Sequence, residues 1–511
     1  MAEAWDIVVI GAGPSGAAAA ARLAEETRAS ICVLEAGEPA DSWRARLPAW
    51  QGDAEHGLDW GRSAPPQDLL GGRRPALPSG RGVGGSELLA PPLWMRAAPE
   101  DFDAWNLPGW DWGALGPSWA EVERRLAPRP PARPEPVSAA LAGTEGVPAA
   151  PPEPAHTGFG LLPGTAPRGA RRTTWDALAA PLADRGRIEL LTGRRVARVL
   201  FRQWRAVAVE LTDGRRITAR GGVILCAGAL ETPTILMRSG IGPSGRIGAL
   251  GLPVAVHVGG VGEHLCVRPL IRLVHDGGGR GGDWKNAARW LVAAAGWTGA
   301  EKGGPLGRCL YEAGGFLRAG HGAGPTDIEA RLRLARPDWP VKDRFAPPGL
   351  TLEARICRPV SRGRVSLAGA DPRLAPRVDP GLLSRDADRA LMRVALRRLR
   401  AIIDREEFEG LVGPEAAPGR KVEDESALDA LVRRTVISGG EMAGTCAMGA
   451  REESPLDPQM RVRGVDGLWV CDTSAFPALP SAGTRAAAAA AGWHGGGMIA
   501  RALATDIRDV A

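Results

Sequence analysis

The 511-residue chain has little lysine, little cysteine and a single tyrosine. Lysine is so rare that almost all of the positive charge is arginine. The seven cysteines include no CxxC pair, and several lie in apolar, strand-like segments, so we expect reduced, buried thiols. No apolar run reaches the roughly 18 residues of a membrane helix, so we expect no membrane partner.

An apolar segment begins within a few residues of Met1 and leaves no room for a signal peptide, so the cytoplasm is the expected location. The net charge is +6, but the arginines are spread along the whole length. This distribution does not predict a nucleic-acid partner, although a basic pocket for an anionic substrate is left open. With 44% hydrophobic and 24% charged residues, the composition is typical of a soluble globular protein. The length of 511 residues predicts two to four domains, which large α/β proteins often interleave.

The N-terminal segment predicts a strand, a glycine-rich turn, a helix and a second strand. The apolar residues 5–10 precede GAGPSG, an alanine-rich stretch follows, and a second apolar run ends at Glu35. We expect Gly11 to make the tight turn, Gly13 to let the backbone approach a pyrophosphate, and Gly16 to allow close helix packing. A carboxylate at Glu35 can accept the hydroxyls of a ribose, which disfavours a phosphorylated ribose. The segment therefore indicates dinucleotide binding.

Three further segments point to a flavin. They are GRGVGGSELLAPPLWMRA at 80–97, GGVILCAGALETPTILMRSGIGP at 221–243, and GGEMAGTCAMG at 439–449 followed by DPQMRVRGVDGLWVCDTSAFPALPSAGT at 457–484. Together with the N-terminal motif they resemble the glucose-methanol-choline flavin oxidoreductases over nearly the whole chain. The resemblance implies FAD, an enzyme, and a small-molecule substrate with dioxygen or another electron acceptor.

The resemblance also implies the fold class and the domains. The expected fold is α/β, with a Rossmann-like FAD-binding domain interleaved with a smaller antiparallel-sheet substrate domain. Segments 1–125, 186–270 and 430–511 would form the FAD-binding domain, and 271–429 the substrate-binding domain. Segment 126–185 would supply a proline-rich connection and cap elements, and its first part, to residue 154, is expected to be extended.

The motifs assign residues to the cofactor by resemblance. Because SELLA at 86–90 contains no histidine where the family attaches its flavin covalently, the FAD is expected to be non-covalent. The expected cofactor-binding residues are Gly11, Gly13, Ser15, Gly16, Glu35, Ala36, Val83, Gly85, Ser86, Ala90, Val196, Ala227, Asp472, Thr473, Gly483 and Thr484.

The presumed catalytic positions depart from the family pattern. The family's histidine three residues before the GTC glycine is Glu441, and its second histidine or asparagine is Gly483. Ala90 replaces an asparagine near the flavin, and Arg268 stands where a histidine is usual. His494, eleven residues beyond Gly483 on the same helix, would lie roughly 16 Å away and could not substitute.

Glu441 is therefore the expected catalytic base. Burial beside an apolar flavin would raise its pKa and suit it to act near neutral pH. The alternative is a structural glutamate paired with an arginine, for which Arg485 is the nearest candidate. Arg485 is itself a candidate catalytic residue, as an anchor for a carboxylate or for negative charge developing on the flavin.

Three functions remain open from the sequence. The first is an FAD-dependent oxidoreductase that oxidises a C–OH bond, or a C–N or C–C bond, by hydride transfer to flavin N5 with Glu441 as base. The second is a non-redox or light-driven relative, such as a lyase, isomerase, cyclase or decarboxylase, that keeps FAD. The third is a flavin-binding partner without catalysis.

Overall fold

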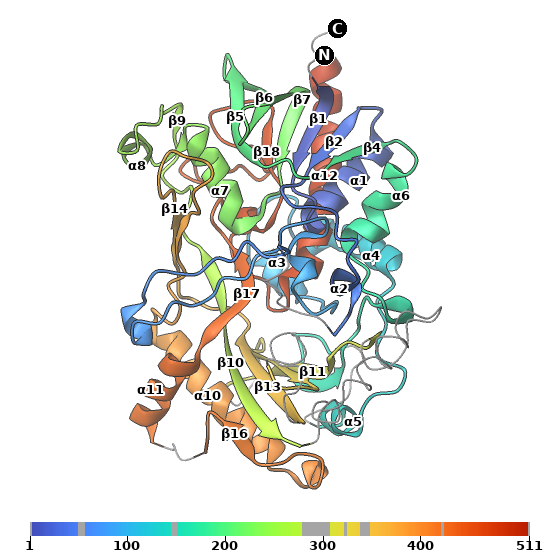
Figure 1. The fold of residues 1–511 in the computed structure, drawn as a ribbon, viewed down its shortest axis with the longest axis vertical. Helices are drawn as coiled ribbons and strands as arrows, with labels where there is room; N and C mark the ends of the chain where they lie inside the picture. The colour runs from blue at the N-terminus through green and yellow to red at the C-terminus, as the bar shows by residue number, and fades with distance from the viewer. Residues whose placement is uncertain are drawn as a thin grey trace.

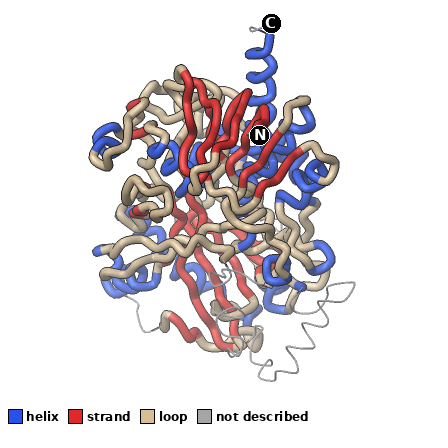
Figure 2. Tube along the Cα trace, turned by 45° about the horizontal axis from the view of Figure 1, so that its top comes forward, coloured by secondary structure: helices blue, strands red, loops and turns tan. Residues whose placement is uncertain are grey.

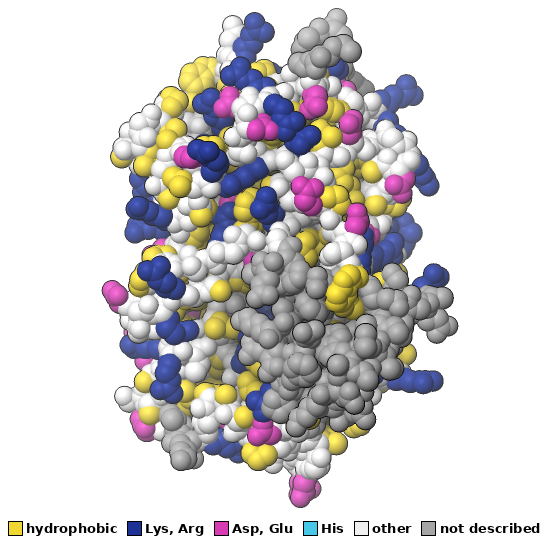
Figure 3. Space-filling model, viewed as in Figure 1, with side chains coloured by type: hydrophobic (Ala, Val, Ile, Leu, Met, Phe, Trp, Pro, Cys, Tyr) yellow, Lys and Arg dark blue, Asp and Glu magenta, His cyan; other side chains and the backbone are white. Residues whose placement is uncertain are grey.

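The computed structural model describes residues 3–49, 57–144, 152–277, 307–320, 324–337, 348–420 and 424–508. Two seven-stranded sheets dominate this part of the chain and follow one another along the long axis of the molecule (Figure 1; Figure 2). On the face drawn in Figure 3 the basic side chains are scattered, as the sequence predicts.

The first sheet has the order β4-β2-β1-β7-β6-β5, with β18 also pairing β7. The strands β4, β2, β1, β7 and β18 pair in parallel, and β5 and β6 add an antiparallel edge. The strands are β1 (Ala4–Ile10), β2 (Ile31–Leu34), β4 (Ile188–Leu191), β5 (Val196–Arg202), β6 (Arg205–Leu211), β7 (Arg216–Leu225) and β18 (Leu468–Val470).

Two helices rich in small residues pack closely beside this sheet: α1 (Pro14–Glu26) and α12 (Thr484–Arg508). A Cβ atom on Gly492 of α12 would lie 2.3 Å from the backbone oxygen of Ser15, so only glycine permits this approach. The five alanines at 17–21 of α1 are fully buried. Small residues thus let α1 and α12 lie side by side.

The second sheet has the order β16-β10-β13-β12-β11-β3 and is antiparallel, with β17 also pairing β10. Helices α10 (Asp386–Ile403) and α11 (Glu425–Thr435) lie beside its lower part, where Met392, Leu396 and Leu399 of α10 are buried (Figure 1). The strands are β3 (Gly158–Leu161), β10 (Cys266–Asp276), β11 (Tyr311–Leu317), β12 (Ile328–Arg333), β13 (Gly349–Ile356), β16 (Glu415–Ala417) and β17 (Ile437–Ala443).

The described residues also form shorter elements. Two small sheets pair β8 (Ile241–Gly242) with β9 (Val256–His257) and β14 (Arg364–Ser366) with β15 (Arg377–Asp379). The other α-helices of the described residues are α2 (Trp43–Arg46), α3 (Pro99–Asp103), α4 (Trp112–Leu126), α5 (Pro136–Ala142), α6 (Ala180–Ala183), α7 (Gly228–Arg238) and α8 (Ser244–Gly248).

The α/β architecture with a Rossmann-like sheet and an antiparallel sheet confirms the predicted fold class. The proline-rich connection is not wholly extended as predicted, because it contains α5. A proline at the first helical position costs no hydrogen bond, which is why Pro136 can begin this helix. The second sheet draws β3 from segment 126–185 and β17 from segment 430–511. The domain boundaries themselves stay a prediction.

All seven cysteines are unpaired, and six are buried. The seventh, Cys309, is partly buried, and loss of solvent around its thiol raises the pKa to about 11, so it stays protonated and weakly reactive near neutral pH. In the described part of the chain, no helix is long and apolar enough to cross a membrane.

Candidate active site

A cavity of about 700 Å³ extends between the two sheets. One part is lined by the glycine-rich turn, Glu35 and the end of β7, and another by the inner face of β10, β12, β13 and β17. The N-terminal ends of both α1 and α12 also reach it. Of the sixteen predicted cofactor residues, all but Gly16 and Val83 line this cavity.

The glycine-rich turn has the geometry that the sequence predicts. Gly11 has φ +109°, and a Cβ there would lie 2.4 Å from the backbone oxygen of Cys226. A Cβ on Gly16 would lie 2.0 Å from the backbone oxygen of Gly11, so the helix can approach the turn only through glycine. Gly85 of the second glycine-rich segment lies directly against Gly13, since its Cβ would be 2.8 Å from the Gly13 Cα. The two segments therefore form one backbone cradle.

Glu35 follows β2 at the edge of this cradle and is buried. Its carboxylate accepts hydrogen bonds from the backbone N–H groups of Ala12 (3.0 Å), Gly37 (2.8 Å) and Gly82 (3.1 Å). Burial raises its pKa, although these hydrogen bonds act in the opposite direction. Glu35 thus ties both glycine-rich segments to β2 and remains at the cavity wall, where its expected role toward the ribose stays a prediction.

Asp472 joins the C-terminal motif to the N-terminus of α7. Its carboxylate accepts hydrogen bonds from Gly228 N (2.8 Å), Thr232 Oγ1 (2.6 Å) and Ser474 N (2.7 Å). Burial raises its pKa. The predicted pair of Asp472 and Thr473 therefore lies at the cavity with the aspartate fixed from two sides.

Glu441 lies on β17 and faces three arginines, one from each of three strands of the second sheet. It pairs with Arg268 of β10, and its Oε1 lies 3.3 Å from Arg355 Nη1 and 3.7 Å from Arg331 Nη2. Burial by itself raises the pKa of Glu441, but the charges of Arg268, Arg355 and Arg331 outweigh burial and hold the pKa below its ordinary value. The predicted upward shift is wrong, because it omitted these arginines.

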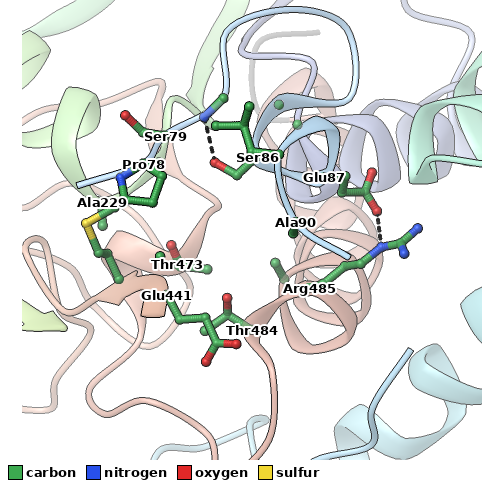
Figure 4. Close-up of a pocket in the computed structure, with 18 of the residues that line it drawn as sticks. Pro78, Ser79, Ser86, Glu87, Ala90, Ala229, Glu441, Thr473, Thr484 and Arg485 are labelled. Carbon is green, nitrogen blue, oxygen red and sulfur yellow. Dashed lines mark hydrogen bonds and ion pairs between the residues drawn. The ribbon is translucent and has the colours of Figure 1, made fainter. Parts of the chain in front are cut away.

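The alternative reading, in which Glu441 pairs with an arginine, is right about the pairing but named the wrong partner, because Arg268 and not Arg485 pairs with Glu441. Arg485 pairs with Glu87 and donates hydrogen bonds to the backbone oxygens of Leu93 (3.2 Å) and Arg172 (3.0 Å). Figure 4 shows its side chain directed toward Glu87 and away from Glu441. Arg485 still lines the cavity, so its role in the reaction stays a prediction.

Gly483 lies directly opposite Glu441, as the alignment of the two motif positions predicts. A Cβ on Gly483 would be 3.4 Å from Glu441 Oε1 and 3.3 Å from Arg331 Nη2. A larger side chain at this position would therefore compete with the Arg331 guanidinium for the same space. The absence of a side chain at Gly483 leaves room for the guanidinium of Arg331, which comes from β12. Arg331 therefore lies beside the position where the resemblance implies a histidine or an asparagine.

No described histidine lines the cavity. His494, on α12, lies 2.9 Å from the backbone oxygen of Gly109 and 3.3 Å from Ser118 Oγ, away from the site. His321 lies outside the described residues. Glu441 is the acid–base group that the described chain presents beside Gly483.

Sequence reasoning missed the charged inner face of the second sheet. On β12, Glu329, Arg331 and Arg333 alternate with Ile328, Ala330 and Leu332, which pack in the core. Alternation with period two places the charged residues on one face of the strand. The sequence IEARLR predicts a strand with one charged face, but such alternation is typical of a strand half exposed to solvent, so burial of the charged face could not be read from it.

Comparison with known proteins identifies the family. Profiles described as GMC oxidoreductase match residues 5–270 and 359–492. The chain belongs to the GMC oxidoreductase family. It is 30% identical to the oxygen-dependent choline dehydrogenase of Rhizobium meliloti, over 92% of this chain and 91% of that protein. It is 28% identical to the chloroplastic fatty acid photodecarboxylase of Chlamydomonas reinhardtii, over 95% of this chain and 88% of that protein.

A solved structure shares the fold over almost the whole chain. The crystal structure of pyridoxine 4-oxidase from Mesorbium loti has a TM-score of 0.80 and 26% identity, and the match covers 96% of this chain and 98% of that one. Members of this GMC family and its structural neighbours bind FAD, which is therefore the cofactor. The glycine cradle fits this assignment, since side chains at Gly11, Gly16 and Gly85 would collide with the backbone.

Replacing Gly16 by alanine is expected to weaken FAD binding. The new methyl group would meet the Gly11 carbonyl and force the turn outward, at a cost of about 1–3 kcal/mol, or roughly 5- to 150-fold in affinity. The ratio of flavin absorbance to protein absorbance after dialysis measures the loss. Gly245→Ala is the matched control, because a Cβ there has no neighbour within 4 Å. Equal flavin retention in both variants would contradict the assigned cradle.

Proposed function

We propose that the chain is an FAD-dependent oxidoreductase that oxidises a C–OH bond, or a C–N or C–C bond, of a small molecule. The observation that carries the proposal is the position of the Glu441 carboxyl group at the cavity, opposite Gly483 and beside the N-terminus of α12, among arginines that lower its pKa. FAD, held in the cradle of Gly11, Gly13 and Gly85, would supply a two-electron acceptor for the substrate hydride, with dioxygen or another electron acceptor as the final oxidant.

The protein's part in this reaction is to hold the substrate and remove its proton. As the hydride leaves a carbon that bears a hydroxyl, that hydroxyl becomes strongly acidic, so even a weakly basic carboxylate can accept its proton. Glu441 Oε1 would take this proton, and the product would be the carbonyl compound. Arg331 and Arg355 keep Glu441 ionised and would stabilise negative charge developing on the substrate oxygen.

The positively charged wall of the cavity also favours a second candidate. Arg272, Arg331, Arg333 and Arg355 all line the cavity, an arrangement suited to a carboxylate substrate. Similarity to a fatty acid photodecarboxylase agrees with this reading. In a light-driven decarboxylation the substrate would release CO₂ and gain a proton, and the flavin would show no net reduction.

The test is the visible spectrum of the purified holoprotein, recorded anaerobically in the dark, before and after addition of alcohols, amines and hydroxy acids. We expect bleaching of the main flavin bands with at least one donor. Consumption of a carboxylic acid only under blue light, with the flavin still oxidised, would replace the first candidate by the second. Absence of both would contradict catalysis of either kind.

A further inference from the structure

Two buried charged side chains hold the segment that leads into Gly483. This lead segment consists of residues 480–482, and Arg268 donates hydrogen bonds to all three of its backbone oxygens (2.5–3.4 Å). Asp101 of α3 accepts hydrogen bonds from the backbone N–H of Ser481 (2.7 Å) and from the Ser481 hydroxyl group. The lead segment is therefore held both at its carbonyl groups and at a donor pair.

The Asp101 carboxylate also reaches the second sheet. Its Oδ1 accepts hydrogen bonds from Arg358 Nε (2.7 Å) and pairs with Arg358 Nη2 (2.6 Å), just beyond the end of β13. Arg268 donates to the backbone oxygen of the preceding residue, Cys357 (2.7 Å), and pairs with Glu441. The contacts thus form a closed ring, in which Arg268 joins Glu441 to the lead segment and to β13, and Asp101 joins the lead segment to β13.

This ring is buried, but most of it lies outside the cavity. Asp101 is 6% exposed, and Ser481 and Arg268 are completely buried. Asp101, Ser481 and Arg358 are not among the described residues that line the cavity, whereas Gly483, which follows the lead segment, is one of them. Hydrogen bonds between buried charged groups are strong because the local dielectric is low. Asp101 can therefore influence the site only through the backbone that it holds.

The lead segment determines where Gly483 lies relative to Glu441. A Cβ on Gly483 would be 3.4 Å from Glu441 Oε1, so a small backbone shift would change the space beside the carboxylate. Misplacement of a positioned group by about 1 Å can lower a rate about 100-fold. The same segment fixes the N-terminus of α12, which lines the cavity and presents the positive end of the helix dipole to it.

We propose that Asp101 is a positioning residue, which acts through Ser481 to hold Gly483 and the N-terminus of α12 in place beside Glu441. The inference rests on the proposed function and adds to it a residue from outside the cavity. Asp101 itself takes no proton in the reaction. Its carboxylate fixes the distance between the proposed proton acceptor and the opposite wall of the site.

Asp101→Asn opens the ring, because the amide can accept hydrogen bonds from Ser481 or from Arg358 but not from both. We expect flavin reduction at saturating donor to slow about tenfold or more, with the amount of bound FAD unchanged. The flavin midpoint potential should fall by about 30 mV, which is a tenfold change for a two-electron couple. A displaced α12 N-terminus stabilises the negative charge of reduction less. The matched control is Asp103→Asn, which alters an exposed carboxylate of the same helix that accepts from Trp112 N and should change neither value.

A second substitution separates positioning from a general loss of stability. The side-chain amide of Arg358→Gln would stand where Nε of the partly exposed Arg358 lies, so it could still donate to Asp101. In the double variant with Asp101→Asn, the glutamine oxygen could instead accept from the new amide and close the ring again. We expect Arg358→Gln alone to stay within about threefold of the wild-type rate. The double variant should regain most of the rate and potential lost in Asp101→Asn.

Ser481→Ala keeps the test decisive if Asp101→Asn does not fold. It removes only the hydroxyl group from the ring and leaves the backbone hydrogen bond to Asp101, so both values should shift in the same direction by a smaller amount. Wild-type rate and potential in a folded Asp101→Asn, or in Ser481→Ala where that variant alone folds, would overturn the proposal. A double variant no better than Asp101→Asn would also overturn it.

The potential is measured without a substrate, so the inference and the proposed function can fail separately. A lowered potential in Asp101→Asn, in a protein whose flavin no donor reduces, would retain the positioning role and reject the proposed oxidation. Reduction by a donor at the wild-type rate and potential in Asp101→Asn would retain the oxidation and reject the positioning role.

Discussion

Replacing Arg268 by methionine is expected to lower the free energy of unfolding by about 3–5 kcal/mol, the effect of removing one partner of a buried ion pair. Arg268 is completely buried and pairs with Glu441. It also donates hydrogen bonds to the backbone oxygens of Ile356 and Cys357 at the end of β13, and of Ala482 before α12. Its loss would leave these oxygens unsatisfied and would release the segment that carries Gly483 from the second sheet.

Denaturant unfolding of the holoprotein, with flavin release followed in parallel, measures this change. Arg373→Met, at an exposed ion pair, is the matched control and should unfold like the wild type. The double variant Arg268→Met with Glu441→Gln should be less destabilised than the sum of the single variants, because it leaves no isolated buried carboxylate. A single variant as stable as the control would contradict the anchoring role of Arg268.

Glu441→Gln is expected to lower the turnover number by about 10²–10⁴-fold, the usual contribution of a positioned proton acceptor. The amide keeps the size of the side chain and can still accept a hydrogen bond from Arg268, but it cannot take the substrate proton. Rapid-mixing measurements of flavin reduction give the rate of the chemical step directly. The control is Glu425→Gln, which removes an exposed glutamate of α11 that also pairs with arginines but lies outside the cavity. This variant should reduce its flavin at the wild-type rate.

The readouts separate a catalytic loss from a structural one. Flavin content and unfolding midpoint should remain measurable in Glu441→Gln even if stability falls, and the rate per bound flavin should still drop. A variant that keeps its flavin and its rate would assign Glu441 a structural role only, as a counter-charge for Arg268.

The cofactor half of the site could be predicted because it is local in sequence. Gly11, Gly13 and Glu35 belong to one β-α-β segment, and the constraints on them come from backbone geometry within that segment. Gly85 and Asp472 were found through motif resemblance, and both lie at the cavity. Local steric rules transfer well from sequence to structure because few alternatives satisfy them.

The charged half could not be predicted in the same way. Glu441 meets Arg268, Arg331 and Arg355, which lie 86 or more residues away on other strands and meet it only through the pairing of the second sheet. The sequence favoured Arg485, which is closer along the chain, yet Arg485 is held by Glu87. The sequence predicted a raised pKa for Glu441, whereas the structure gives a lowered one. Burial could be inferred from the local sequence, but the opposing charges of distant arginines could not.

The most direct test of the account is the pH dependence of anaerobic flavin reduction by a donor substrate in the dark. In the proposed reaction the ionised form of Glu441 is the active form, and the three arginines hold its pKa below the ordinary value of roughly 4.3 for a glutamate. The account predicts reduction whose rate shows no Glu441-dependent inflection between about pH 5 and about pH 8, and falls only at more acidic pH. An inflection near neutrality that disappears in Glu441→Gln, or a flavin that no donor reduces, would contradict it.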